Sequence, residues 1–113
     1  MWGHAVLYEL RTYETFAGKM PDLNRRFNAH TVKLFEKHGI QNVGYWTTDV
    51  GPKSNALTYL VAFKDAGQRA DAWKSFRADP DWQKAATESH KNGIIVANVE
   101  NQLLIPTSYS PLQ

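Results

Sequence analysis

QNVGYWTTDVGPKSNALTYLVAF, residues 41–63, is the stretch that decides the fold. Its two ends, 41–50 and 56–63, are rich in β-branched and aromatic residues, which favour strands. GPKSN lies between them, and its glycine, proline, serine and asparagine supply the dihedral angles and local hydrogen bonds of a turn. The stretch therefore predicts an antiparallel β-hairpin.

Helical patterns flank this hairpin on both sides. Before it, residues 19–38 carry apolar side chains at helical spacing, tolerate a proline in the first turn and are followed by a glycine. After it, residues 66–78 predict a second helix, and a third segment starts where Asp79 can cap the chain and Pro80 can take the first helical position. We therefore expect one helix before the hairpin and a broken helix after it.

Strand-like runs close the pattern at both ends, at residues 5–13 and 94–105. The order strand, helix, strand, strand, helix, strand is that of the split βαββαβ or ferredoxin-like α+β fold. This order predicts a four-stranded antiparallel sheet with the helices on one face. We expect a single domain over residues 1–113, with a core at about 5–106 and an irregular tail at 107–113.

The face of the sheet without helices also needs a cover. The strand at 56–63 has apolar side chains on both sides, with one set at Leu57, Tyr59, Val61 and Phe63 and the other at Leu60 and Ala62. A bare apolar sheet face exceeds the few hundred Å² of apolar patch that monomers usually expose. The sequence therefore predicts a homodimer that packs through this face.

Composition excludes several classes of function. The 13 basic and 11 acidic residues are interleaved, so no basic block predicts a nucleic-acid partner. Apolar runs are far shorter than the roughly 20 residues that cross a bilayer, and the first residues do not form an export leader. The chain has no cysteine, which excludes disulfides and thiolate zinc sites. We expect a cytoplasmic protein with no membrane span, no metal and no cofactor.

Four stretches carry a resemblance to a known family: YELRTYETFAGKMPDL (8–23), HTVKLFEKHGIQNVGYWTTDVGP (30–52), ADPDWQKA (78–85) and VENQLLIPTSYSP (99–111). In their order and spacing the chain resembles the NIPSNAP family over nearly its whole length. This resemblance implies the dimeric α/β-barrel form of the ferredoxin-like fold. Animal members are linked to vesicle transport and mitochondrial quality control, but the resemblance supplies no catalytic motif that maps onto this chain.

His30 is the first candidate for chemistry. At 100° per residue, Leu23, Phe27 and Leu34 lie within about 40° of one another, and His30 lies about 20° beyond Leu23 toward Arg26. One interpretation is a half-buried imidazole bonded to a backbone carbonyl or a strand tyrosine. The other is a base or ligand of a polar pocket between the helix and the sheet.

Arg11 is the second candidate. It shares one side of its strand with Glu9 and Tyr13, and a buried guanidinium needs a partner. One interpretation is a structural ion pair near the dimer face with Glu9 or with Glu100. Alternatively, Arg11 and Tyr13 present donors to a small anionic or carbonyl ligand.

The tryptophans allow the same two interpretations. Trp46, Trp73 and Trp82 fill a small core efficiently, or they form the wall of a pocket for a planar molecule. The helix break at Pro80 favours a pocket mouth beside Trp82.

These observations lead to three functional hypotheses. The leading one is a homodimer whose pocket, lined by Arg11, Tyr13, His30 and Trp46, with Trp82 at its mouth, binds a small organic molecule with a polar or anionic end. The second is a cofactor-independent monooxygenase in which His30 moves a proton on an aromatic or quinol substrate. The third is a protein-interaction module that uses the GPKSN turn and the C-terminal tail.

Overall fold

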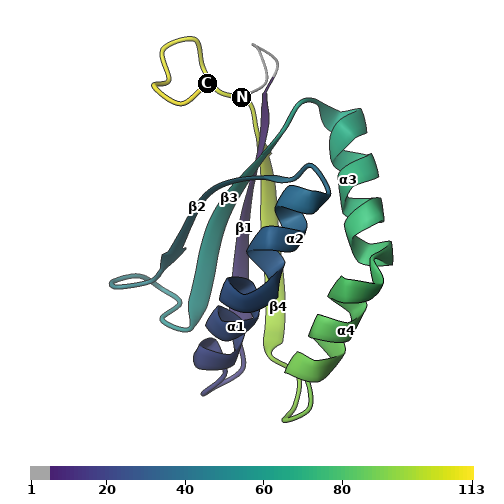
Figure 1. Cartoon of the computed structure of the whole chain (residues 1–113). Coiled ribbons are helices and arrows are strands. Elements are labelled where there is room, and N and C mark those ends of the chain that lie inside the picture. Colours follow the sequence, from purple (N-terminus) through teal and green to yellow (C-terminus); the bar gives the residue numbers. More distant parts are fainter. Residues whose placement is uncertain (1–5) are drawn as a thin grey trace.

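The computed structural model describes residues 6–113. Its elements follow the predicted order (Figure 1): β1 (Leu7–Thr15), α1 (Met20–Arg26), η1 (Phe27–Thr31), α2 (Val32–Lys37), β2 (Gln41–Thr47), β3 (Ala56–Phe63), α3 (Ala66–Ala78), α4 (Pro80–Ser89) and β4 (Val96–Leu104). α1, η1 and α2 run on as one helix, and η1 is a π-helical turn within it.

The four strands form one antiparallel sheet in the order β2-β3-β1-β4. Both helical segments cover the same face of this sheet, as Figure 1 shows. The predicted α+β, split βαββαβ architecture is therefore confirmed. β1 runs to Thr15, two residues past its predicted end, and the predicted start at residue 5 lies outside the described residues. None of the described helices is long and apolar enough to cross a membrane.

The core lies between the sheet and the helices. The side chains of β3 that were predicted to share one side, Leu57, Tyr59, Val61 and Phe63, are all buried there. Aromatic rings from α2 and α3 pack onto them, with the Phe35 and Phe76 ring centroids 5.0 Å apart. Burial of each such side chain stabilises the fold by about 2–3 kcal/mol, so this layer fixes the position of the helices.

The π turn changes which residues of the first helix are buried. Val32 donates its backbone N–H to the carbonyl of Phe27, five residues back, which inserts one extra residue into the turn. The fully buried positions therefore recur every fourth residue, at Leu23, Phe27, Thr31 and Phe35. A regular helix of 100° per residue would have kept Leu34 on the buried stripe. Instead, Leu34 is half-buried and the predicted rim residue His30 is exposed.

The junction between α3 and α4 is built as predicted. Asp79 accepts a hydrogen bond from the backbone N–H of Asp81 at 2.8 Å and caps α4, and Pro80 stands at its first position. The same carboxylate lies 2.8 Å from Nζ of Lys37 and 2.6 Å from Nε2 of His38. Hydrogen bonds from Lys37 and His38 lower the pKa of Asp79. This contact fastens the end of α2 to the α3–α4 junction.

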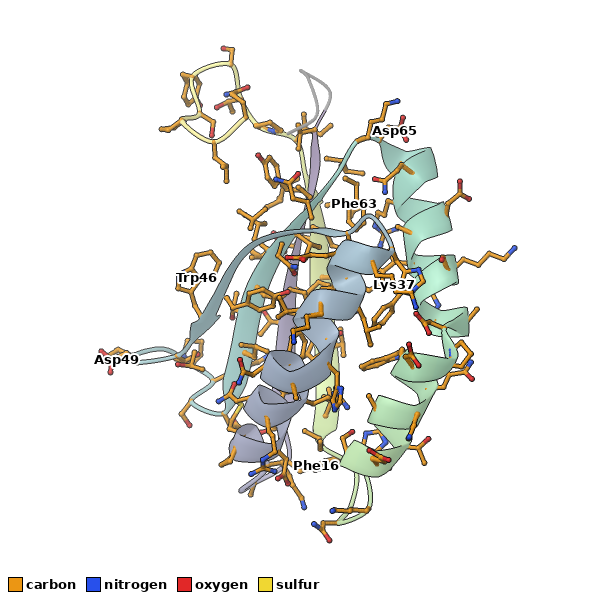
Figure 2. The ribbon with its side chains drawn as sticks, viewed as in Figure 1. Phe16, Lys37, Trp46, Asp49, Phe63 and Asp65 are labelled. Atoms are coloured by element: carbon orange, nitrogen blue, oxygen red, sulfur yellow. The ribbon has the colours of Figure 1, made fainter. Side chains whose placement is uncertain are left out.

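The opposite face of the sheet has no helical cover. The strand registers place on it the apolar side chains of Tyr8, Leu10, Val43, Trp46, Leu60, Ala62 and Leu104, which we call the bare face. Trp46 is 54% exposed, and Figure 2 shows its ring standing clear of the helices. The ring lies over Gly44, where a Cβ would come within 2.6 Å of it, so this flat arrangement requires the glycine.

Candidate functional site

A buried carboxylate organises the polar side chains between β1 and α3. Glu9 is 0% exposed and accepts five hydrogen bonds. Arg69 of α3 supplies two of them at 2.8 and 3.1 Å, and Arg11 supplies one at 2.7 Å. The indole N–H of Trp73 and the amide of Asn101 on β4 each donate one at 2.9 Å. Both oxygens of this carboxylate are therefore fully occupied.

Each nitrogen of Arg11 also has a hydrogen-bond partner. Its Nε donates to the hydroxyl of Tyr59 at 2.8 Å and its Nη2 to the hydroxyl of Tyr13 at 3.2 Å. The guanidinium also lies 4.7 Å from the centre of the Trp73 ring, within the range of a cation–π contact. The predicted structural ion pair of Arg11 with Glu9 is thus confirmed. Its expected location near the dimer face was wrong, because this side of β1 faces the helices.

Electrostatics keep this pair charged. Burial acts to raise the pKa of Glu9, but the hydrogen bonds from Arg69, Asn101, Trp73 and Arg11 lower it to about 2. Burial acts to lower the pKa of Arg11, but Tyr59, Tyr13 and Glu9 together raise it above its ordinary value. All nitrogens of Arg11 have protein partners, so its guanidinium has no free edge for a ligand. Glu100, the other predicted partner, pairs with Lys53 instead.

The structure separates the residues that were predicted to line one pocket. Arg11 and Tyr13 lie on the helix side of the sheet, and the Tyr13 ring packs edge-on against Phe27 at 5.8 Å. Trp46 lies on the bare face, so it cannot line the same cavity as Arg11 within one protomer. His30 lies on η1 and points into a groove between this helix and α4. Trp82 lies at the inner side of α4, where its ring is 4.6 Å from that of Phe76.

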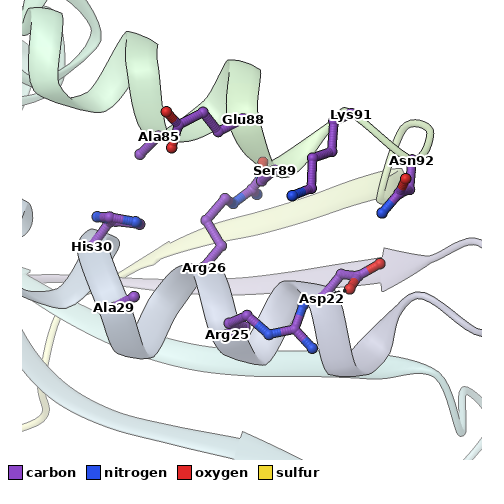
Figure 3. Close-up of a pocket in the computed structure, with 10 residues that line it drawn as sticks. All are labelled: Asp22, Arg25, Arg26, Ala29, His30, Ala85, Glu88, Ser89, Lys91 and Asn92. Atoms are coloured by element: carbon purple, nitrogen blue, oxygen red, sulfur yellow. Dashed lines mark hydrogen bonds and ion pairs between the residues drawn. The ribbon is translucent and has the colours of Figure 1, made fainter.

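This groove runs between the first helix and α4. It consists of two adjoining hollows, of about 210 and 360 Å³, and both are lined by Ala29, His30, Ala85 and Glu88. We call it the helix groove (Figure 3). Alanines on both walls keep it open, because larger side chains at these positions would fill it. It is on the helix side of the molecule, so packing of another protomer against the bare face would leave it accessible.

Arg26 lies in the helix groove and was not identified as a site residue from the sequence. It is only 7% exposed, and Figure 3 shows its side chain reaching across from α1 toward Ser89. Its Nη1 lies 3.3 Å from Oγ of Ser89 and 3.4 Å from Nε2 of His90. Its Nε is buried without a partner, and no carboxylate within residues 6–113 lies at ion-pair distance.

The surroundings of Arg26 disfavour the charged form of its guanidinium. Burial lowers the pKa of the Arg26 guanidinium, while Tyr13 and Tyr59 act in the opposite direction. Among residues 6–113, its cation–π partner is the Trp82 ring, whose centre is 5.3 Å away. A sequence signal for this burial exists: Arg26 lies three residues after Leu23 and directly before Phe27, on the flank of the buried stripe. In the part of the chain that the structure describes, no three metal-binding side chains gather.

Together, the fold and the groove define a ferredoxin-like α+β domain with a ligand-sized groove between its helices. The NIPSNAP family model matches residues 8–111, and the chain belongs to the NIPSNAP family. Among curated proteins, it is 25% identical to "Protein NipSnap homolog 3B" of Mus musculus over 103 residues and 26% identical to "Protein NipSnap homolog 1" of Danio rerio over 107 residues. These matches cover 91% and 95% of the chain but only 41% and 36% of the relatives, so the chain spans well under half of their length.

Solved structures agree with this assignment. A NIPSNAP family protein of unknown function from Agrobacterium tumefaciens is 26% identical, with a TM-score of 0.85 that covers 98% of this chain and 96% of the other. A more distant neighbour is SnoaB, a cofactor-independent oxygenase from Streptomyces nogalater. It is 17% identical with a TM-score of 0.59, and the match covers 95% of this chain and 98% of that one. At that identity the similarity shows a shared fold.

Proposed function

We propose that this chain is a homodimeric domain that binds a small organic molecule in the helix groove. The main observation behind this proposal is the groove itself. It is large enough for a small ligand, and it is lined by polar side chains that can still form hydrogen bonds. His30 and Arg26 line it, and Trp82 adjoins it through Arg26. Arg11 and Tyr13 support it from beneath as part of the core, while Trp46 belongs to the proposed dimer face.

The dimer part of the proposal rests on the bare face. No helix covers it; Tyr8 and Ala62 are buried among their neighbours, but Trp46 and Leu104 remain substantially exposed. Because a symmetric pair of such faces buries its own apolar surface, an identical subunit is the occupant that we propose. The proposal includes one functional domain and a cytoplasmic location, which the absence of cysteine supports.

Sedimentation tests the dimer. The wild-type chain should sediment as a dimer at micromolar concentration, and Leu60→Arg should sediment as a monomer because it puts a charge at the centre of the bare face. Val50→Arg is the matched control, since Val50 lies in the exposed loop between β2 and β3. A folded wild-type monomer at this concentration would contradict the proposal.

A groove-filling substitution tests ligand binding. Ala29→Phe should fill the helix groove, and Ala70→Phe places the same side chain on an exposed position of α3 outside it. Ligand-observed NMR with a library of small acids, phenols and amides should find compounds that bind to the wild type and to Ala70→Phe but not to Ala29→Phe. If every bound compound also binds to Ala29→Phe, the groove is not the site.

The fold shared with an oxygenase supports a second candidate function. In this second function, the groove holds a phenol or quinol substrate, and His30 moves a proton during a cofactor-independent oxidation by molecular oxygen. Oxygen uptake with candidate substrates should then disappear in His30→Ala while the protein stays folded. Unchanged uptake in this variant would remove His30 from such a mechanism.

A further inference from the structure

Arg26 is a buried cation with no carboxylate at ion-pair distance among residues 6–113. Its Nε makes no hydrogen bond, and Nη1 reaches two neutral or titratable groups at the long end of the hydrogen-bond range, 3.3 and 3.4 Å. A buried guanidinium is ordinarily paired, because removing it from water is costly unless an anion compensates. Arg11, which lies on β1, shows the ordinary solution with a carboxylate at 2.7 Å. The protein therefore leaves one guanidinium unpaired in the groove.

The charges around the groove limit what can pair with it. The hollow that contains Arg26 is lined by three cationic side chains, Arg25, Arg26 and Lys91, and by the two carboxylates of Asp22 and Glu88. Asp22 is already bound to Arg25 at 2.8 Å. Apart from the histidines, one positive charge remains in this hollow, and the adjoining hollow adds another, because it holds Lys33 and Lys84 against Asp81. A monoanion at Arg26 balances the first of these charges without placing a second negative charge beside Glu88.

The walls of the groove indicate the rest of the ligand. Ala29 of the first helix and Ala85 of α4 line both hollows and offer apolar contact to a short hydrocarbon or aromatic body. His30 lies on the same wall as Ala29 and can bond a polar substituent away from the anionic end. The π turn places these residues, because it turns His30 outward while Arg26 stays buried.

We propose that Arg26 is the anion receptor of the helix groove and that the ligand is a small organic monocarboxylate. The carboxylate bonds the outer nitrogens of the Arg26 guanidinium, and its apolar body lies between Ala29 and Ala85. This inference rests on the proposed function, because it names the class of ligand that the same groove takes.

The arginine Nε–H signals of the ¹⁵N-labelled chain of residues 1–113 provide the test. Benzoate and its neutral amide, benzamide, are titrated in dilute buffer at low salt. The Arg26 Nε–H signal should shift saturably with benzoate, at a Kd about tenfold or more lower than that for benzamide. The Nε–H signals of Arg11 and Arg69, which are bonded to Tyr59 and Glu9, should not move and serve as internal controls.

Two variants complete the experiment. Arg26→Met should weaken benzoate binding by about tenfold or more while the Arg11 and Arg69 signals stay in place, and Arg26→Lys should recover part of the affinity. If benzamide binds as tightly as benzoate and Ala29→Phe abolishes both, the groove binds ligands but Arg26 is not the receptor. Tighter binding of inorganic phosphate than of benzoate, or an unmoved Arg26 signal at millimolar benzoate, would also overturn the inference.

Discussion

Arg11 and Arg26 lie on the same side of the sheet and are both largely withdrawn from water, yet their surroundings differ. The three nitrogens of Arg11 donate hydrogen bonds to Glu9, Tyr59 and Tyr13. In Arg26, Nη1 lies 3.3 and 3.4 Å from its two partners, and the buried Nε has no hydrogen-bond partner among residues 6–113. The difference teaches that burial alone does not assign a role to an arginine. A guanidinium with complete partners holds the fold together, and one with missing partners is available to a ligand.

The largest effect is expected from the carboxylate that organises the Arg11 side. Glu9→Gln removes the charge that Arg11 and Arg69 share, and it leaves two partly buried guanidinium groups without this counter-charge. The free energy of unfolding should fall by about 3–5 kcal/mol, measured by urea denaturation. Glu100→Gln, at an exposed carboxylate on β4, should change it by less than about 0.5 kcal/mol. Equal effects of both variants would mean that the Glu9 network does not stabilise the fold.

The same carboxylate predicts how stability depends on pH. The pKa of Glu9 is about 2 in the folded chain, below its ordinary value near 4.5, so the unfolded state binds the proton more readily. Its contribution, about 3 kcal/mol, is present above about pH 4.5 and is lost as the pH falls through about 2. The difference in unfolding free energy between the wild type and Glu9→Gln should therefore shrink over this interval. A difference that stays constant down to pH 2 would contradict the prediction.

Tyr59→Phe would make Arg11 resemble Arg26. It removes the hydroxyl that accepts from Nε of Arg11 and leaves that nitrogen without a partner, while the aromatic ring continues to fill the core. The expected loss is about 1–2 kcal/mol of unfolding free energy, in urea denaturation at fixed protein concentration. An unchanged stability would show that an unpaired Nε carries no cost in this core, which would weaken the argument from Arg26.

The smallest effect is expected at the nearest partner of Arg26. Ser89→Ala removes the 3.3 Å hydrogen bond from Arg26 and the 2.7 Å hydrogen bond that Ser89 donates to the carbonyl of Ala86, so the free energy of unfolding should fall by less than about 1 kcal/mol under the same conditions. A loss as large as that of Tyr59→Phe would show that Ser89 satisfies Arg26, and the comparison between the two arginines would fail.

The sequence predicted the order of strands and helices because hydrophobic period, caps and turn residues are local signals. Asp79 and Pro80 mark the start of α4, and the alternation in β3 separates its two faces. The ion pair between Glu9 and Arg11 was also predictable, because two residues apart on a strand share a face.

The groove was not predictable in the same way. A helical wheel assumes a constant angle per residue, so it cannot show the extra residue of the π turn that turns His30 outward. The irregular pairing at Val43 similarly hides the side of the sheet on which Trp46 lies. The position of Arg26 beside the buried stripe is a local signal, but its burial also depends on α4, about 60 residues further along the chain, and no local pattern indicates that contact.

Paired substitutions of the two arginines give the most direct test. Methionine at each position retains most of the apolar stem and removes the charge, and urea unfolding is measured at one protein concentration without added carboxylate. We expect Arg11→Met to lose about 2–4 kcal/mol and Arg26→Met to stay within about 1 kcal/mol of the wild type or to exceed it. If Arg26→Met is destabilised as strongly as Arg11→Met, Arg26 is a structural residue and the groove has no unpaired charge to offer a ligand.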